Sequence, residues 1–88
     1  MNHPFTETKQ GGHYIREFSQ DTNEEEFIWH RDREDRIVES LHDTDWKLQL
    51  DEELPVSLNK PIFIKEGLFH RLIKGTGNLK IKLIKTLL

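Results

Sequence analysis

Apolar and polar residues alternate along the second half of the chain. In Trp46–Leu50, the side chains of Trp46, Leu48 and Leu50 share one phase of a two-residue repeat, and the residues between them are polar. Successive side chains of a strand point to opposite faces of the sheet, so this stretch predicts a strand with one buried face. Residues 54–58 repeat the pattern around Pro55 and Ser57, which predicts a second strand.

The end of the chain allows two interpretations. The stretch LKIKLIKTLL has apolar residues three and four apart, as an amphipathic helix has. It also alternates strictly, with Leu79, Ile81 and Leu83 in one phase and lysines in the other. This alternation and the β-branched isoleucines favour a strand over Asn78–Lys85.

Further short apolar stretches are separated by turn-forming residues. They predict strands at His13–Phe18, Phe27–Arg31, Arg36–Leu41, Pro61–Lys65 and Leu68–Ile73. Residues 1–12, which end at Gly11-Gly12, are expected to be a flexible lead-in, and residues 13–88 a single domain. About eight short strands with regular turn signals are typical of a small all-β sandwich or barrel.

Composition fits a polar but foldable protein. The chain has 88 residues, of which 34% are hydrophobic and 33% charged, and it contains no cysteine. This length allows one modest core, and the missing cysteines exclude disulfides and thiolate chemistry. The first residues lack the apolar run of a signal peptide, and no stretch approaches a membrane span of about 18 apolar residues. We therefore expect a soluble, cytoplasmic protein without a membrane partner.

Charge divides the chain into two halves. The net charge of -3 argues against a nucleic-acid partner. Residues 1–54 carry 6 Lys/Arg and 15 Asp/Glu, whereas residues 55–88 carry 7 Lys/Arg and 1 acid. We favour the interpretation that strands from both halves interleave in one sheet system, so that their opposite charges offset each other. The alternative is a basic surface for an acidic partner.

Candidate chemistry lies in the stretch FIWHRDREDRIVESL, residues 27–41. A strand would direct His30 and Asp32, two residues apart, to the same face. Arg36 is the last residue of the polar run that begins at His30. Further along the chain, His70 shares a face with Leu68 and Leu72. If these faces form the inside of a barrel, the polar side chains line a pocket.

With these residues the chain resembles the cupin superfamily, the small jelly-roll β-barrels. Cupins carry a first motif with His-x-His, a Glu and a Gly, and a second motif with Pro-x-Gly-x-x-His. Here His30-Arg31-Asp32 stands for the His-x-His pair, and Arg36 lies where the glutamate belongs. In the second motif, Lys65-Glu66-Gly67-Leu68-Phe69-His70 keeps the glycine and the final histidine. The resemblance covers about residues 25–85.

The resemblance implies a metal site built from His30, Asp32 and His70. Two histidines and a carboxylate suit Fe, Mn, Ni or Zn and leave positions for a ligand, as in a metal-dependent dioxygenase or isomerase. Arg36 argues against a metal, because a guanidinium stays charged and cannot coordinate one. The residues are therefore equally consistent with no bound metal.

Two alternatives to a metal enzyme follow from Arg36. In the first, Arg36 pairs with Asp32 in a structural network, which leaves a degenerate site in a partner-binding protein. In the second, Arg36 binds a small anionic ligand together with His30 and His70, because arginine can donate two hydrogen bonds to a carboxylate or phosphate. Gln49 is then a possible polar wall residue of a non-catalytic ligand-binding pocket.

The two tryptophans carry separate expectations. Trp46 shares phase with Leu48 and Leu50, which predicts a place in the core. Trp29 points away from the His30 face, toward a subunit contact or the N-terminal segment. Because small cupins commonly dimerise and a short barrel gains from burying more apolar surface, we expect a homodimer.

Overall fold

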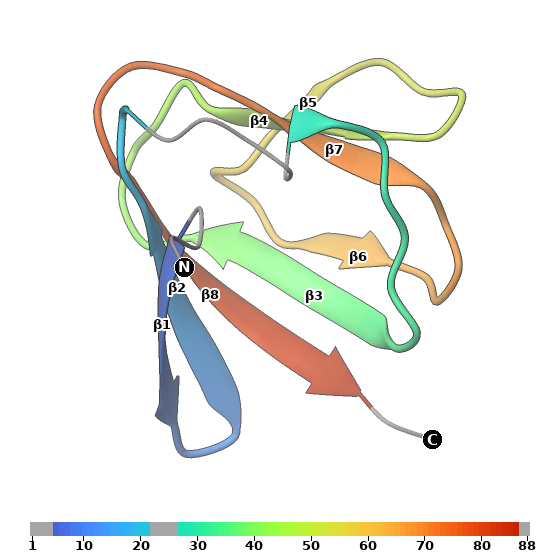
Figure 1. Cartoon of the computed structure of the whole chain (residues 1–88), viewed down its shortest axis with the longest axis horizontal. Helices are drawn as coiled ribbons and strands as arrows, with labels where there is room; N and C mark the ends of the chain where they lie inside the picture. Colours follow the sequence, from blue (N-terminus) through green and yellow to red (C-terminus); the bar gives the residue numbers. More distant parts are fainter. Residues whose placement is uncertain (1–4, 22–26, 87–88) are drawn as a thin grey trace.

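The protein is built from antiparallel strands arranged in two sheets. The computed structural model describes residues 5–21 and 27–86. Its strands are β1 (Phe5–Gln10), β2 (His13–Phe18), β3 (Asp35–Ser40), β4 (Lys47–Leu50), β5 (Val56–Ser57), β6 (Ile62–Ile64), β7 (His70–Ile73) and β8 (Leu79–Thr86). One sheet has the order β1-β2-β8-β3-β6, and the other has the order β5-β4-β7. In Figure 1 the five-stranded sheet occupies the lower part of the view and the three-stranded sheet the upper part.

Strand β8 explains how the two charged halves of the sequence fit together. It lies between β2 and β3, so a strand from the basic half is flanked by two strands from the acidic half. Lys80 is the cross-strand partner of Glu17 on β2, and Lys82 is the partner of Glu39 on β3. Opposite charges facing each other across strands favour this pairing. The expected interleaving of the two halves is confirmed.

The core lies between the two sheets and follows the predicted alternation. Leu79, Ile81 and Leu83 of β8 are buried, which confirms the strand and rejects the helical alternative. Trp46 is 0% exposed, and its ring lies 6.3 Å from that of Phe18 between centroids. Within the described ranges, no helix is long and apolar enough to cross a membrane.

The first described strand corrects the expectation of a flexible lead-in. Phe5–Gln10 forms β1 and pairs along its whole length with β2, while residues 1–4 lie outside the described residues. Gly11 has a φ of 60° in the turn that joins the two strands, a conformation that glycine adopts without strain. Apolar and polar residues do not alternate in β1, because most of its side chains are exposed. Backbone pairing at a sheet edge holds the strand in place.

Two further strand predictions are wrong in part. The stretch Phe27–Arg31 is not a strand, and only His30 forms an isolated bridge, with His70. In the stretch 54–58, only Val56–Ser57 forms a strand, and Leu54 is 83% exposed. Pro55 has no backbone N–H to donate to a ladder, which agrees with this shortening.

Gly75 follows β7 and lies close to Asp45 and Trp46, the two residues before β4. A Cβ atom at this position would lie 2.6 Å from the backbone nitrogen of Trp46 and 2.7 Å from its Cδ1, and it would also overlap Asp45 Oδ1. The Asp45 carboxylate accepts hydrogen bonds from the backbone N–H and the hydroxyl of Thr76. These two bonds lower the pKa of Asp45 and fix the loop beside β4.

We therefore expect Gly75→Ala to destabilise the protein by about 1–3 kcal/mol, because the backbone of Trp46 must move to admit a methyl group. For a domain of this size, each 1 kcal/mol lowers Tm by about 4–8 °C. Thermal unfolding followed by circular dichroism measures the change. Gly12→Ala is the matched control, since a Cβ there meets nothing within 4 Å. Equal losses in the two variants would contradict this account.

Candidate metal centre

His30 and Asp32 lie on an irregular segment that runs beside β7 and the turn before it. The backbone N–H of His30 donates to the carbonyl of His70 at 3.0 Å, and the N–H of His70 donates back at 2.8 Å. Two residues on, the carbonyl of Asp32 accepts from the N–H of Gly67 at 2.9 Å. Gly67 has a φ of 79°, which permits the turn that leads into β7. Backbone contacts therefore place both polar residues against His70, although the segment is not a strand.

The two histidine rings are oriented by backbone carbonyls. Nδ1 of His30 lies 2.8 Å from the carbonyl oxygen of Ile28, and Nδ1 of His70 lies 2.8 Å from that of Leu68. A carbonyl only accepts, so each Nδ1 carries the proton, and in a neutral ring Nε2 then bears the lone pair. Histidines that bind metals commonly donate their other ring N–H in this way. The ring centroids lie 4.4 Å apart.

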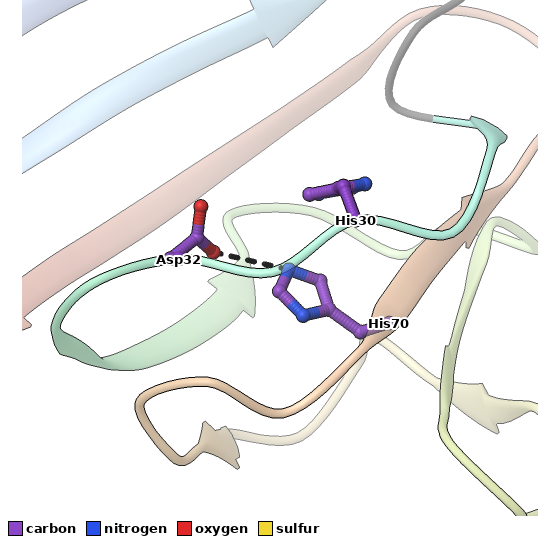
Figure 2. Close-up of side chains that lie close together, drawn as sticks. All are labelled: His30, Asp32 and His70. Atoms are coloured by element: carbon purple, nitrogen blue, oxygen red, sulfur yellow. Dashed lines mark ion pairs between the residues drawn. The ribbon is translucent and has the colours of Figure 1, made fainter.

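The Asp32 carboxylate lies next to the His70 ring. Its Oδ2 lies 3.1 Å from Nε2 of His70; a dashed line joins the two side chains in Figure 2. Oδ2 is also buried, and among the described residues no donor meets it with hydrogen-bond geometry. Burial alone would raise the pKa of Asp32, but His70, Arg36 and His30 outweigh it and lower the pKa below its usual value. Oδ2 of Asp32 therefore faces Nε2 of His70. A proton on this nitrogen would pair the ring with the carboxylate, and beside the neutral ring a cation between the two atoms would take the place of that proton.

Comparison with known proteins identifies the fold. No family model and no curated protein matches the sequence. A cupin-2 domain protein from Shewanella frigidimarina NCIMB 400 superposes with a TM-score of 0.63 at 15% identity, over 99% of this chain and 85% of that chain. The chain has the cupin fold. A candidate mannose-6-phosphate isomerase from Ralstonia eutropha JMP134 gives a TM-score of 0.64 at 11% identity, over 92% of this chain and 81% of the other. A Neisseria meningitidis protein gives 0.62 at 9%, over 94% and 82%.

The fold brings together the three residues expected to bind a metal. One ligand atom from each of His30, Asp32 and His70 lies within 4.8 Å of the other two. Two ligands at about 2.1 Å from one ion and at right angles to each other would be about 3.0 Å apart. The 3.1 Å between His70 Nε2 and Asp32 Oδ2 agrees with that spacing. With both imidazoles anchored through Nδ1, the group fits a divalent ion.

Arg36 lies next to this group and is partly neutralised. Its Nη1 is 3.2 Å from Asp32 Oδ2, and its Nη2 donates to Glu34 Oε1 at 2.9 Å. The expected ion pair with Asp32 is therefore present. Glu34 supplies a second negative charge, which reduces the repulsion that Arg36 would exert on a bound cation. Glu34 was not among the candidate residues predicted from the sequence.

A small cavity adjoins the histidines inside the cupin barrel. Its volume is about 40 Å³, and four of its lining residues are polar: Arg16, His30, Arg36 and His70. The other eight are aliphatic or aromatic residues of the core. Arg16 was missed by sequence analysis. The available signal was its phase on β2, because Arg16 shares the face of Tyr14 and Phe18, two residues away on either side, and so faces inward.

Gln49 lies apart from the cupin cavity, so the expectation that it forms a wall of the pocket is wrong. Its Oε1 accepts from Arg71 Nε at 2.9 Å, and its Nε2 donates to the carbonyl of Glu53 at 2.9 Å. The alternation of β4 explains this, because the inward positions belong to its neighbours Leu48 and Leu50. Gln49 therefore contributes to the outer face of the three-stranded sheet.

On that outer face, two arginine–aromatic pairs flank the bridge between His30 and His70. The Arg71 guanidinium lies 4.9 Å from the ring of Trp29, and that of Arg31 lies 5.2 Å from the ring of Phe69. Each pair joins the irregular segment to β7 or to the residue before it. Such contacts contribute about 0.5–1 kcal/mol each at exposed sites. From the outer face of the sheet, these contacts help to hold the backbone of His30 against that of His70.

Proposed function

We propose that this cupin binds one divalent ion, of Fe, Mn, Ni or Zn, through His30, Asp32 and His70, and acts as a metal-dependent enzyme. The observation that supports this most is the pairing of two carbonyl-anchored imidazoles with a buried carboxylate oxygen within 4.8 Å. Two histidines and one carboxylate leave several positions of a divalent ion open for a ligand. The bound ion would supply Lewis acidity or, if it is iron, activation of dioxygen.

The protein's own residues define what kind of ligand this site accepts. The cavity of about 40 Å³ is far below the roughly 300–1,000 Å³ of sites for drug-sized ligands. A hexose phosphate, the substrate class in the name of the Ralstonia relative, would therefore not enter this cavity without rearrangement. The mainly apolar walls would exclude water from a small ligand held beside the histidines. Asp32 also lines a wider recess of about 560 Å³, so dioxygenase and isomerase chemistry both stay within the proposal.

Metal uptake tests the proposal. Protein purified without a chelating column is stripped, dialysed against each of the four ions, and analysed for bound metal by mass spectrometry. We expect one ion per chain, and little uptake by His70→Ala, because that variant loses one of three ligands. His13→Ala is the matched control, since His13 lies on β2 outside the group. Absence of metal in the wild type after all four dialyses would refute the proposal.

A second function, non-catalytic ligand binding without metal, is favoured by one observation. Arg36 places a permanent cation 3.2 Å from Asp32 Oδ2, where a metal ion would need the same oxygen. If this ion pair persists, His30, His70 and Arg36 would form a polar recess for a small ligand. A thermal-shift screen of sugars, carboxylates and phosphates on the metal-free protein, read as a rise in Tm, tests this alternative.

A further inference from the structure

A mainly apolar recess is lined by edge strands of both sheets. Strand β5 is an edge of the three-stranded sheet, and β6 is an edge of the five-stranded sheet. Residues of both strands line this recess of about 560 Å³, which shares no lining residue with the cavity beside the histidines. An edge strand leaves backbone N–H and C=O groups without partners in its own sheet, and proteins usually cover such an edge. The recess therefore lies where another chain can be added to the fold.

The recess presents large apolar side chains to solvent. Leu54 is 83% exposed, Phe63 55% and Val56 39%. Ile37, the cross-strand partner of Phe63, is also exposed, so the apolar surface continues from the recess onto the five-stranded sheet. Single exposed apolar residues are ordinary on a protein surface, whereas several that line or adjoin one recess are typical of a binding face.

Leu54 projects from an ordered turn. It lies in the hairpin that joins β4 to β5. In this hairpin the N–H of Glu53 donates to the carbonyl of Leu50 at 3.1 Å, and Gln49 Nε2 donates to the carbonyl of Glu53 at 2.9 Å. These hydrogen bonds fix the backbone next to Leu54, so its exposure is a feature of the folded turn.

Opposite charges lie beyond the two ends of β5. Glu53 is in the hairpin before this strand, and Lys60 follows the strand by three residues. Both side chains line the recess and are exposed, and neither forms an ion pair with another described residue. One end of β5 therefore carries a negative charge and the other a positive charge. Such a surface is complementary to a copy of itself turned by 180°, because the rotation brings each end against the opposite one.

We propose that this recess is the contact surface of a symmetric homodimer, in which it covers the same recess of a second copy of the chain. The exposed side chains of Leu54 and Phe63 form the apolar centre of the contact, and Glu53 of each copy faces Lys60 of the other. This assignment goes beyond the proposed function and requires no metal. It moves the subunit contact expected from the sequence away from Trp29, which does not line the recess.

Sedimentation velocity of the metal-free protein, prepared with a chelating resin, tests the dimer over a range of concentrations. A contact of this size belongs to the small and weak class, so we expect a monomer at about 1 µM and a dimer at about 500 µM. A protein that remains a monomer at the highest concentration would overturn the proposal.

Charged substitutions in the recess test which surface forms the contact. Phe63→Glu and Leu54→Lys should each weaken dimerisation at least about tenfold, because a charge would then be buried in the apolar centre. Ile28→Lys is the matched control, since Ile28 is 63% exposed but does not line the recess. All three side chains are exposed, so we expect the variants to fold, and circular dichroism checks this. An undiminished dimer in either recess variant, or equal weakening by the control, would assign the contact to another face and overturn the proposal.

Exchange of the two charges tests the symmetric arrangement. Glu53→Lys and Lys60→Glu should each weaken the dimer at least about fivefold, because both symmetry-related contacts become repulsive. The double variant should dimerise as the wild type does. An equimolar mixture of the two single variants should also associate, since each contact of the mixed dimer again joins opposite charges. Failure of either the double variant or the mixture to recover association would overturn the proposed arrangement.

Discussion

Trp46→Ala is expected to lower the free energy of unfolding by about 3–5 kcal/mol, the usual loss for a large buried aromatic residue. The Trp46 side chain is fully buried, with ring centroids 6.3 Å from Phe18 and 6.0 Å from Phe27. Its Nε1 also donates to the carbonyl of Gly77 at 3.0 Å. The total free energy of unfolding of an 88-residue domain is about 4–13 kcal/mol. The variant should therefore lose a large share of its stability, measured as the urea midpoint.

Trp29→Ala provides the matched control, because it removes the same side chain from the surface. Trp29 is 42% exposed and contacts the Arg71 guanidinium. We expect a loss of about 1 kcal/mol or less, from that contact and a small buried area. Similar losses in the two variants would show that Trp46 does not anchor the core.

The strands that sequence analysis predicted best have one face in the core. In β4 and β8, burial of every second side chain produced the two-residue repeat that was visible in the sequence. Strand β1 has no such signal, because hydrogen bonds to β2 rather than buried side chains hold it. For Phe27–Arg31 the error was the opposite, because a strand was predicted where the structure has none. Ile28 and Trp29 are apolar but exposed, and the Trp29 ring contacts Arg71 on the outer face instead of extending a ladder.

The candidate site was predictable to the extent that short motifs carry it. His30, Asp32 and His70 were expected together because of the resemblance to cupins, and backbone contacts bring them within 4.8 Å. Neither motif contains Arg16. Its phase on β2 shows that it faces inward, but its place beside the cavity depends on the register of β2 against β8 and β1. Gln49 was placed wrongly although its phase opposite Leu48 was readable. Residues that reach a cavity across two strands require the register, which alternation alone does not supply.

Asp32→Asn is expected to reduce metal affinity more than any other conservative change in the chain. Asparagine keeps the shape of the side chain but removes the negative charge that a divalent ion requires beside two neutral imidazoles. Loss of a residue that merely supports a ligand typically costs about 10–100-fold in metal affinity, so loss of a ligand should cost at least about 100-fold. Competition with a fluorescent chelator measures the affinity of wild type and variant for Zn²⁺ and Mn²⁺.

Asp35→Asn is the matched control for this effect. It makes the same chemical change and the same change in net charge three residues away, where Asp35 Oδ1 accepts from the N–H of Glu66 at 2.8 Å. We expect its metal affinity to stay within about threefold of the wild type, because an exposed charge at a distance is screened by solvent. If Asp32 served only as the partner of Arg36 and His70, Asp32→Asn would lower the Tm of the metal-free protein and leave metal affinity unchanged. That result would assign the carboxylate to the ion-pair network and exclude it as a metal ligand.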